Sequence, residues 1–257
     1  MPIKNELKLF RSQHGKIIEH IRVSTLAGYW FCAAKSYLQA LGVNSPSSPA
    51  TEAGTELHNA FTAARPPSQL EIELENYLKR FMVNIDTGAG STGLAGTEDK
   101  VFARAWKRDG QVVGWITSHG FDDFRVDPDK KVTIVEYKTT SQKVVDWYKL
   151  STAIFQLKVY MWMIEPLLKQ GGYTLHKAEI VYYPQLGKRD KRQPHEVEPL
   201  GVKTITDYSE ASVEADIENI FKQFGEPTKM IPPARYKCYM CHPNFKSQCP
   251  FQGVPQS

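Results

Sequence analysis

The sequence predicts an α/β or α+β fold in which helices flank a mixed central sheet. Helical patterns come first along the chain, antiparallel strand patterns follow, and a long apolar helix then leads into a further strand. This order of elements is typical of a sheet that combines antiparallel and parallel strands. With 257 residues, of which 41% are hydrophobic, the chain is long enough for a real core, and we expect a single domain over 1–257.

Three helical patterns make up a predicted N-terminal part over 20–83. Ser24 could cap a helix that runs to about Leu41, where Gly42 follows as a stop signal. A short helical stretch begins at Gly54 and ends before two prolines. The third pattern covers 69–83, where apolar residues recur at helical spacing.

Two hairpins open the predicted core, which we place at 98–206. The stretches VFARAWKR and QVVGWITS flank Asp109-Gly110, a strong signal for a two-residue hairpin. FDDFRVD and KVTIVEYKT form a second pair, with a turn between Asp127 and Lys130. A helix over about 151–170, a strand over 178–183 and a short strand near Val202 complete this core.

The segment 207–257 combines one more helix with a loop-like end. Asp207 or Ser209 begins the helix, and Gly225 follows it. Its apolar side chains recur on one face: Val213, Ile217, Ile220, Phe221 and Phe224. The last thirty residues or so hold three of the four cysteines.

Charge and hydropathy set limits on the partners. The net charge of +4 and the pI of about 8.7 permit a nucleic-acid partner but do not demonstrate one. The longest apolar stretch, Val159 to Ile164, is too short to cross a bilayer, so we expect no membrane partner. The first ten residues lack the apolar segment of a secretory signal. We therefore expect a cytoplasmic protein.

The stretch GFDDFRVDPDKKVTIVEYKTT carries the strongest chemical signal. Alternation along a strand places Glu136 and Lys138 on one side. Charged side chains at the end of an apolar strand need partners, and Asp122 and Asp123 lie one hairpin away. Carboxylate oxygens suit Mg²⁺ or Mn²⁺. The pattern is nonetheless short and common, and taken alone it favours a hairpin whose surface charges form ordinary ion pairs.

Four short motifs in one order resemble the RecB-like branch of the PD-(D/E)xK superfamily. They are a helical histidine in GTELHNAF, then GFDD, VEYK and QLKVY. The resemblance runs from about Val23 to the last cysteine. It implies a nuclease core of this superfamily, in which the expected metal ligands are His58, Asp123 and Glu136, and the catalytic residues are Asp123, Glu136 and Lys138.

The same resemblance implies supporting residues. Gln156 and Tyr160, four apart on a helix, would contact the DNA backbone or steady the site. Glu98 occupies a place where relatives often have an acidic residue. The residue before the aspartate is usually apolar in relatives, and here it is Asp122, so a shift of one residue would make Asp122 the ligand.

The cysteines form a one-plus-three pattern. Cys32 is alone, while Cys238, Cys241 and Cys249 form C-x2-C-x7-C-P. Such clustering in a cytosolic protein indicates a zinc or iron–sulfur site rather than disulfides. The pattern resembles the CRISPR-associated RecB-like exonuclease family and AddB-type nuclease domains, although Ala33 stands where a proline often follows the first cysteine. This implies a [4Fe–4S] cluster that joins the N-terminal helices to the C-terminal loop.

The function implied by these resemblances is hydrolysis of phosphodiester bonds by a Mg²⁺- or Mn²⁺-dependent DNA exonuclease, with endonuclease activity as a further form. Single-stranded DNA or DNA ends are the expected substrates. The setting would be CRISPR adaptation, with integration proteins as partners, or viral and phage recombination and repair, with recombination proteins. The alternative is a non-cleaving iron–sulfur module that binds DNA as a scaffold or redox sensor.

Overall fold

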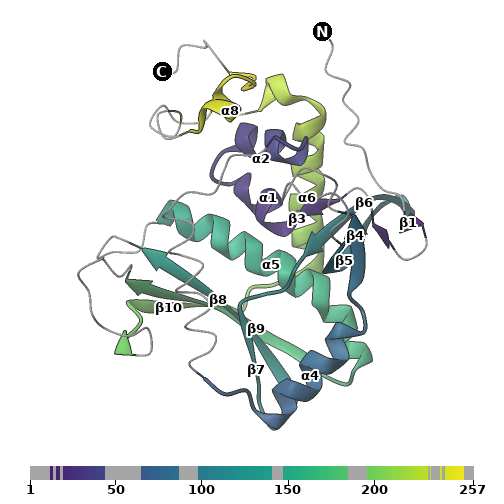
Figure 1. Cartoon of the computed structure of the whole chain (residues 1–257), viewed down its shortest axis with the longest axis vertical. Helices are drawn as coiled ribbons and strands as arrows, with labels where there is room; N and C mark the ends of the chain where they lie inside the picture. Colours follow the sequence, from purple (N-terminus) through teal and green to yellow (C-terminus); the bar gives the residue numbers. More distant parts are fainter. Residues whose placement is uncertain are drawn as a thin grey trace. The chain divides into compact units, whose positions relative to one another are not determined.

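The computed structural model of the chain describes residues 12–13, 16–17, 20–43, 65–86, 98–140, 147–184, 196–230, 232, 238 and 241–251. The chain forms two compact units (Figure 1). The first unit is assembled from three segments, Met1–Ser45, Met82–Gly120 and Ala211–Ser257. The second unit comprises Pro46–Phe81 and Phe121–Glu210. Each sequence-predicted hairpin therefore lies in a different unit.

The second unit contains a mixed sheet, as the sequence predicts. Its strands lie in the order β10-β9-β8-β7. The outer pairs are antiparallel, whereas β8 and β9 are parallel. The strands span Asp123–Val126 (β7), Lys131–Thr140 (β8), Thr174–Pro184 (β9) and Gly201–Ile205 (β10).

Helix α5, Trp147–Gln170, connects the two parallel strands and packs on β8 and β9 (Figure 1). Parallel neighbours need a crossover of this kind, because a tight turn can join only antiparallel strands. The helix is apolar on most sides and buries large side chains, among them Leu157, Met161 and Trp162. It ends at the predicted Gly171-Gly172, where Gly172 has a positive φ of 76°. The crossover thus lays α5 over one face of β8.

Helix α4, Gln69–Lys79, contacts the edge strand β7. It begins with a capping box, in which the Ser68 side chain and the Glu71 side chain each accept from the other residue's backbone N–H. The helix is shorter than the predicted 69–83, because the chain turns after Lys79 and enters strand β4 at Val83. Val83 and Ile85 of that strand pack against Val101 of the first unit.

The first unit contains a second sheet, of six strands in the order β1-β2-β4-β5-β6-β3 in the described part of the chain. The predicted Asp109-Gly110 hairpin is confirmed: the two residues have φ values of 50° and 78°, as a two-residue turn of type I′ requires. The strands span Ser12–Gln13 (β1), Lys16–Ile17 (β2), Ile21–Arg22 (β3), Val83–Asp86 (β4), Glu98–Arg108 (β5) and Gln111–Ser118 (β6).

The prediction of one helix from Ser24 to about Leu41 is wrong. The structure has two, α1 at Val23–Gly28 and α2 at Ala33–Ala40. The break occurs because Cys32 adopts an extended conformation, with φ −157° and ψ 103°, and serves as the N-cap of α2. The apolar residues Leu26 and Tyr37 recur at a spacing that fits either a continuous or a broken helix. Periodicity alone therefore could not reveal the break.

Helix α6, Glu210–Gly225, packs through the apolar face that the sequence predicts. The ring of Phe224 lies 5.7 Å from that of Tyr37 and 6.3 Å from that of Tyr29. A short 3₁₀ helix at Pro227–Lys229 and helix α8 at Pro243–Lys246 follow. Among the helices that the structure describes, none combines the length and apolar character needed to cross a membrane.

Candidate active site

Four polar side chains meet where β8 passes under α5. Glu136 is 2% exposed, and its Oε1 contacts the Lys138 ammonium and accepts a hydrogen bond from Gln156 Nε2 at 2.9 Å. The same amide nitrogen donates to the Tyr160 hydroxyl at 2.9 Å, and Lys138 Nζ lies 3.5 Å from Gln156 Oε1. The structure thus brings together the two predicted strand residues and the two predicted helix residues.

The charges of this cluster are unevenly buried. The Glu136 side chain is 3% exposed and that of Lys138 is 31% exposed, so the carboxylate lies inside while the ammonium reaches solvent. A buried carboxylate is costly unless cations and hydrogen-bond donors compensate its charge. Lys138 and Gln156 supply both. The cluster therefore presents an oriented anion with a cation at its outer edge.

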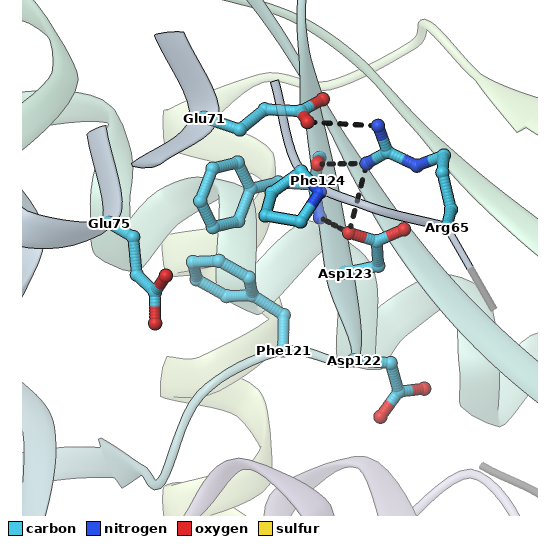
Figure 2. Close-up of a pocket in the computed structure, with 8 residues that line it drawn as sticks. Arg65, Glu71, Glu75, Phe121, Asp122, Asp123 and Phe124 are labelled. Carbon is cyan, nitrogen blue, oxygen red and sulfur yellow. Dashed lines mark hydrogen bonds and ion pairs between the residues drawn. The ribbon is translucent and has the colours of Figure 1, made fainter. Parts of the chain in front are cut away.

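The two adjacent aspartates differ in their surroundings. Asp123 lies directly opposite Val135 in the β7–β8 pair, so its side chain shares the face of Val135 and Tyr137, not that of Glu136. Its Oδ2 accepts a hydrogen bond from the Tyr137 hydroxyl at 2.9 Å. Strand alternation gives Asp122 the opposite direction, and Figure 2 shows the two carboxylates pointing apart.

Asp122 is fixed by the backbone of the neighbouring strand. Its Oδ2 accepts a hydrogen bond from the Tyr137 N–H at 2.8 Å, just before β7 begins at Asp123. The side chain thereby takes a position that a backbone carbonyl would occupy if β7 continued. Tyr137 consequently holds Asp122 through its main chain and Asp123 through its side chain.

A second network supports Asp123 from the side of α4. Arg65 donates to Glu71 Oε2 at 2.8 Å, to Asp123 Oδ1 at 3.4 Å and to the carbonyl of Phe124 at 3.2 Å, as Figure 2 shows. Glu71 Oε1 also accepts from the N–H of Val126 in the edge strand at 3.2 Å. One buried carboxylate therefore ties the start of α4 to Arg65 and to β7.

The electrostatics of this network have identifiable causes. Burial raises the pKa of the Glu71 carboxyl. This effect is outweighed by hydrogen bonds from Arg65 and from the backbone N–H groups of Ser68 and Val126, together with the charge of Arg65, so the pKa is lowered overall. Burial raises the pKa of the Tyr137 phenol, and the Asp123 charge and hydrogen bond raise it further. Glu71 is therefore held ionised, and the Tyr137 phenol is held as a donor.

A cavity of about 270 Å³ lies beside the aspartates, between α4 and the start of β7. Its walls combine aromatic rings with charged groups, which Figure 2 draws as sticks. The residues that line it are Arg65, Pro67, Glu71, Glu75, Phe121, Asp122, Asp123 and Phe124. Sequence reasoning identified only the aspartates; the S-x-x-E capping motif at Ser68 was the one visible signal for Glu71.

The donor chemistry fits a hard divalent cation. Glu136 and Asp122 provide carboxylate oxygens, the ligands that Mg²⁺ and Mn²⁺ prefer. In the part of the chain that the structure describes, no group of three His, Cys, Asp or Glu side chains is gathered for metal binding. Two further residues of the predicted site cannot be placed in this way. His58 lies outside the described residues. The backbone of Glu98 begins β5, but its side chain is outside the described part of the chain.

The four cysteines all belong to the first unit, and none forms a disulfide. Burial raises the pKa of the Cys32 thiol, which the nearby thiols of Cys241, Cys249 and Cys238 raise further. Lys35 of α2 lies over the ring of Phe245 in α8, 5.3 Å from its centroid. The first cysteine and the C-terminal three are therefore neighbours in space.

Comparisons with known proteins give a family. The family model described as the PD-(D/E)XK nuclease superfamily matches residues 20–253. No curated protein sequence matches the chain.

Three solved structures are similar to the chain. The structure of SSO0001 has 14% sequence identity to this chain, and the match covers 95% of this chain and 88% of SSO0001, with a TM-score of 0.43. A protein from Eubacterium rectale, described as a candidate exonuclease, is 12% identical, covering 93% and 90%, with a TM-score of 0.44. A phage-related exonuclease from Haemophilus somnus 129PT is 14% identical, covering 81% and 94%, with a TM-score of 0.30. Because the family model spans most of its length, the chain belongs to the PD-(D/E)XK nuclease superfamily.

Proposed function

We propose that this nuclease is a Mg²⁺- or Mn²⁺-dependent deoxyribonuclease whose site is built around Glu136. The observation that carries the proposal is the buried Glu136 carboxylate, oriented by Lys138 and Gln156, with Asp122 at the adjoining end of β7. Membership of the superfamily supports hydrolysis of phosphodiester bonds.

Asp122 and Glu136 are the proposed metal ligands. The β7–β8 register supports Asp122 over Asp123, because Asp123 shares the Tyr137 face and is bonded to the Tyr137 hydroxyl and Arg65. Asp123 then acts as a positioning residue. His58 is proposed as a further ligand, and Glu98 as an additional acidic group, on the sequence motifs alone. A divalent cation at this site would lower the pKa of a bound water and so generate the nucleophile.

Lys138, Gln156 and Tyr160 are proposed to orient the Glu136 carboxylate and to stabilise the charge of the phosphate. Lys138 holds its partly exposed ammonium where it can stabilise negative charge that develops on a phosphate or orient the attacking water. Gln156 fixes the direction of Glu136, and Tyr160 fixes Gln156. Tyr160 is largely buried, so it supports Gln156 in preference to making a broad contact with DNA.

Single-stranded DNA or DNA ends are the proposed substrates, and exonucleolytic cleavage is the proposed mode. CRISPR integration proteins or recombination proteins are the proposed partners, according to the setting in which the nuclease works. These finer assignments follow from the resemblance of the ordered motifs and the cysteine pattern.

We also propose that the four cysteines hold a [4Fe–4S] cluster. The four cysteines belong to one unit, and their number matches the ligand set of such a cluster or of a zinc site. Its role would be structural, because hydrolysis requires no electron transfer. The cluster would tie α2 to the segment around α8.

The experiment that tests the proposed function uses Glu136→Gln, which preserves shape and removes the charge. Labelled single-stranded and duplex DNA are incubated with Mn²⁺ or Mg²⁺. We expect the cleavage rate of the variant to fall by more than about 100-fold. Loss of a residue that only hydrogen-bonds to a metal ligand already lowers metal affinity or activity by about 10–100-fold, and Glu136 is proposed to be a ligand itself. Full activity of Glu136→Gln would refute the mechanism, and DNA binding without cleavage by the wild type would favour the non-cleaving alternative.

A matched control is available on the next strand. Glu179 of β9 is also buried and lies opposite Val135, so it is on the far face of the same sheet. It pairs with Arg125 and Lys177 and has no place in the proposed site. Glu179→Gln should therefore retain cleavage while removing a comparable buried charge.

A further inference from the structure

The cavity beside Asp122 adjoins the proposed catalytic cluster through one aromatic residue. The ring of Phe121 contacts the ring of Phe124 at 5.8 Å and the ring of Tyr160 at 6.1 Å, both edge to face. Phe121 and Asp122 line the cavity, while Tyr160 bonds Gln156 next to Glu136. A strand that places a phosphate at Glu136 and Lys138 would therefore bring an adjacent nucleotide to this opening.

The charges around the cavity favour a neutral occupant over a phosphate. Four carboxylates line it, from Glu71, Glu75, Asp122 and Asp123, against one guanidinium, that of Arg65. Arg65 is already bonded to Glu71 and Asp123. Glu75 is paired with Lys79 at 2.7 Å, and Asp122 is a proposed ligand of the divalent cation, so the described lining of the cavity has no cation of its own left to bind a phosphate.

A neutral planar group fits the same walls. Phe121 and Phe124 are both partly buried, and their rings stand at 78° to one another, so the two rings offer surfaces of different orientation. Aromatic side chains stack nucleobases without strong sequence preference, because every base has a π-face. Glu75, on the α4 side in Figure 2, adds a carboxylate that can accept a hydrogen bond from an exocyclic amino group.

We propose that this cavity is a subsite for one unstacked nucleobase of the DNA strand, adjacent to the scissile phosphate, with the base stacked on one of the Phe121 and Phe124 rings and in edge contact with the other. The proposal rests on the nuclease function proposed above. A base held there would fix the position of its neighbouring phosphate relative to Glu136. The subsite would favour single-stranded DNA or frayed ends, since a paired base is not available for it.

The first test measures cleavage of single strands that lack one base. An abasic nucleotide is moved one position at a time along a labelled oligonucleotide, and the Mn²⁺-dependent rate at a defined bond is measured. We expect one position beside that bond to slow the wild type about 10-fold, the loss expected for one stacked base. Phe121→Leu should be slow on the intact strand and no longer respond to base removal at that position.

Phe81→Leu is the matched control. Phe81 follows α4 and pairs with the ring of Tyr77, outside the cavity lining. This variant should retain the full response to the abasic position. A wild type that is indifferent to base removal at every position, or a Phe121→Leu variant with undiminished sensitivity, would overturn the subsite.

A second readout does not depend on cleavage. The same strand with 2-aminopurine at the sensitive position is bound to Glu136→Gln protein, which leaves the strand intact, and its fluorescence is recorded. We expect stacking to quench the fluorescence, and Phe121→Leu or Phe124→Leu in that background to abolish the quenching. Absence of quenching at every position would refute the subsite, whereas quenching in a wild type that cleaves nothing would refute the nuclease function alone. Should Phe121→Leu fail to fold, Phe124→Leu serves both tests.

Discussion

The carboxylate of Asp122 accepts a hydrogen bond from the backbone N–H of Tyr137 at 2.8 Å. Tyr137 lies between Glu136 and Lys138, so the segment that carries two proposed catalytic groups also fixes the third. Because the donor belongs to the main chain, no single substitution at Tyr137 other than proline removes this bond. The position of Asp122 is therefore fixed independently of the side chain at position 137.

Neutralising each aspartate in turn distinguishes their roles. Asp122→Asn should remove a metal ligand and lower the cleavage rate by more than about 100-fold, whereas Asp123→Asn should lower it about 10–100-fold, the range for groups that orient ligands. Single-turnover cleavage across a Mn²⁺ titration measures both. Near-wild-type activity of Asp122→Asn, combined with an inactive Asp123→Asn, would reverse the assignment.

Removing the phenol of Tyr137 tests the positioning network. Tyr137→Phe deletes the hydrogen bond to Asp123 and should destabilise the fold by about 1.5–3 kcal/mol, as for hydrogen bonds to charged groups. Mn²⁺ affinity should also fall about 10-fold. Denaturant unfolding and metal titration measure the two effects. Tyr183→Phe, whose ring lies 6.0 Å from that of Tyr137, is the control and should leave metal affinity unchanged.

Gln156 should affect the metal as well as turnover. Its amide donates to Glu136 and to Tyr160, so Gln156→Met removes a donor from the proposed ligand while it keeps the length of the side chain. We expect metal affinity and cleavage rate to fall together, about 10-fold or more. Tyr160→Phe, which keeps the ring against Phe121, should reduce both less. Unchanged metal affinity in Gln156→Met would confine that residue to DNA contact.

The proposed cysteine cluster predicts a chemical signature. Wild-type protein purified without oxygen should contain iron and show visible thiolate-to-iron absorbance, and Cys32→Ser should lose both and unfold at a lower temperature. Ser36→Ala is the control, because it removes the nearby buried hydrogen bond to the Thr25 carbonyl and leaves every thiol in place. A colourless protein with one zinc per chain would show that the metal is zinc and not iron. A metal-free protein would refute the cluster.

His20 predicts a pH dependence of stability. Burial, followed by the charges of Arg22 and His119, lowers the pKa of His20 from 6.5 to about 4. Its contribution to stability is complete above pH 6.5 and is lost as the pH falls toward about 4, because the unfolded chain takes up the proton first. His20→Asn keeps an acceptor for Thr117 and should flatten the unfolding free energy over this window. An identical slope in both proteins would contradict the assignment.

The order of elements and the proximity of Glu136 to Lys138 and Gln156 could be predicted from the sequence because they depend on local patterns. The Asp109-Gly110 turn requires two positive φ values, which glycine and aspartate tolerate, and the E-x-K spacing fixes that Glu136 and Lys138 share a face. The placement of Gln156 over Glu136 follows from the crossover between parallel strands.

What the sequence could not predict depends on pairing and on distant contacts. The choice between Asp122 and Asp123 requires the register of Asp123 with Val135, since a slip of one residue reverses every side chain. The contact of Arg65 with Asp123 joins residues 58 positions apart and has no local signature. Cys32 breaks a helical pattern that continues in composition on both sides.

The assembly of the first unit from three separate segments has a consequence for its synthesis. Phe224, which packs on Tyr37, leaves the ribosome 187 residues later, since 224 − 37 = 187. At about 5–20 residues per second, α2 waits roughly 10–40 s for that partner. The second unit, which ends at Glu210, is complete before then. The face of α2 that Phe224 covers therefore remains accessible during this interval, when a chaperone could bind it.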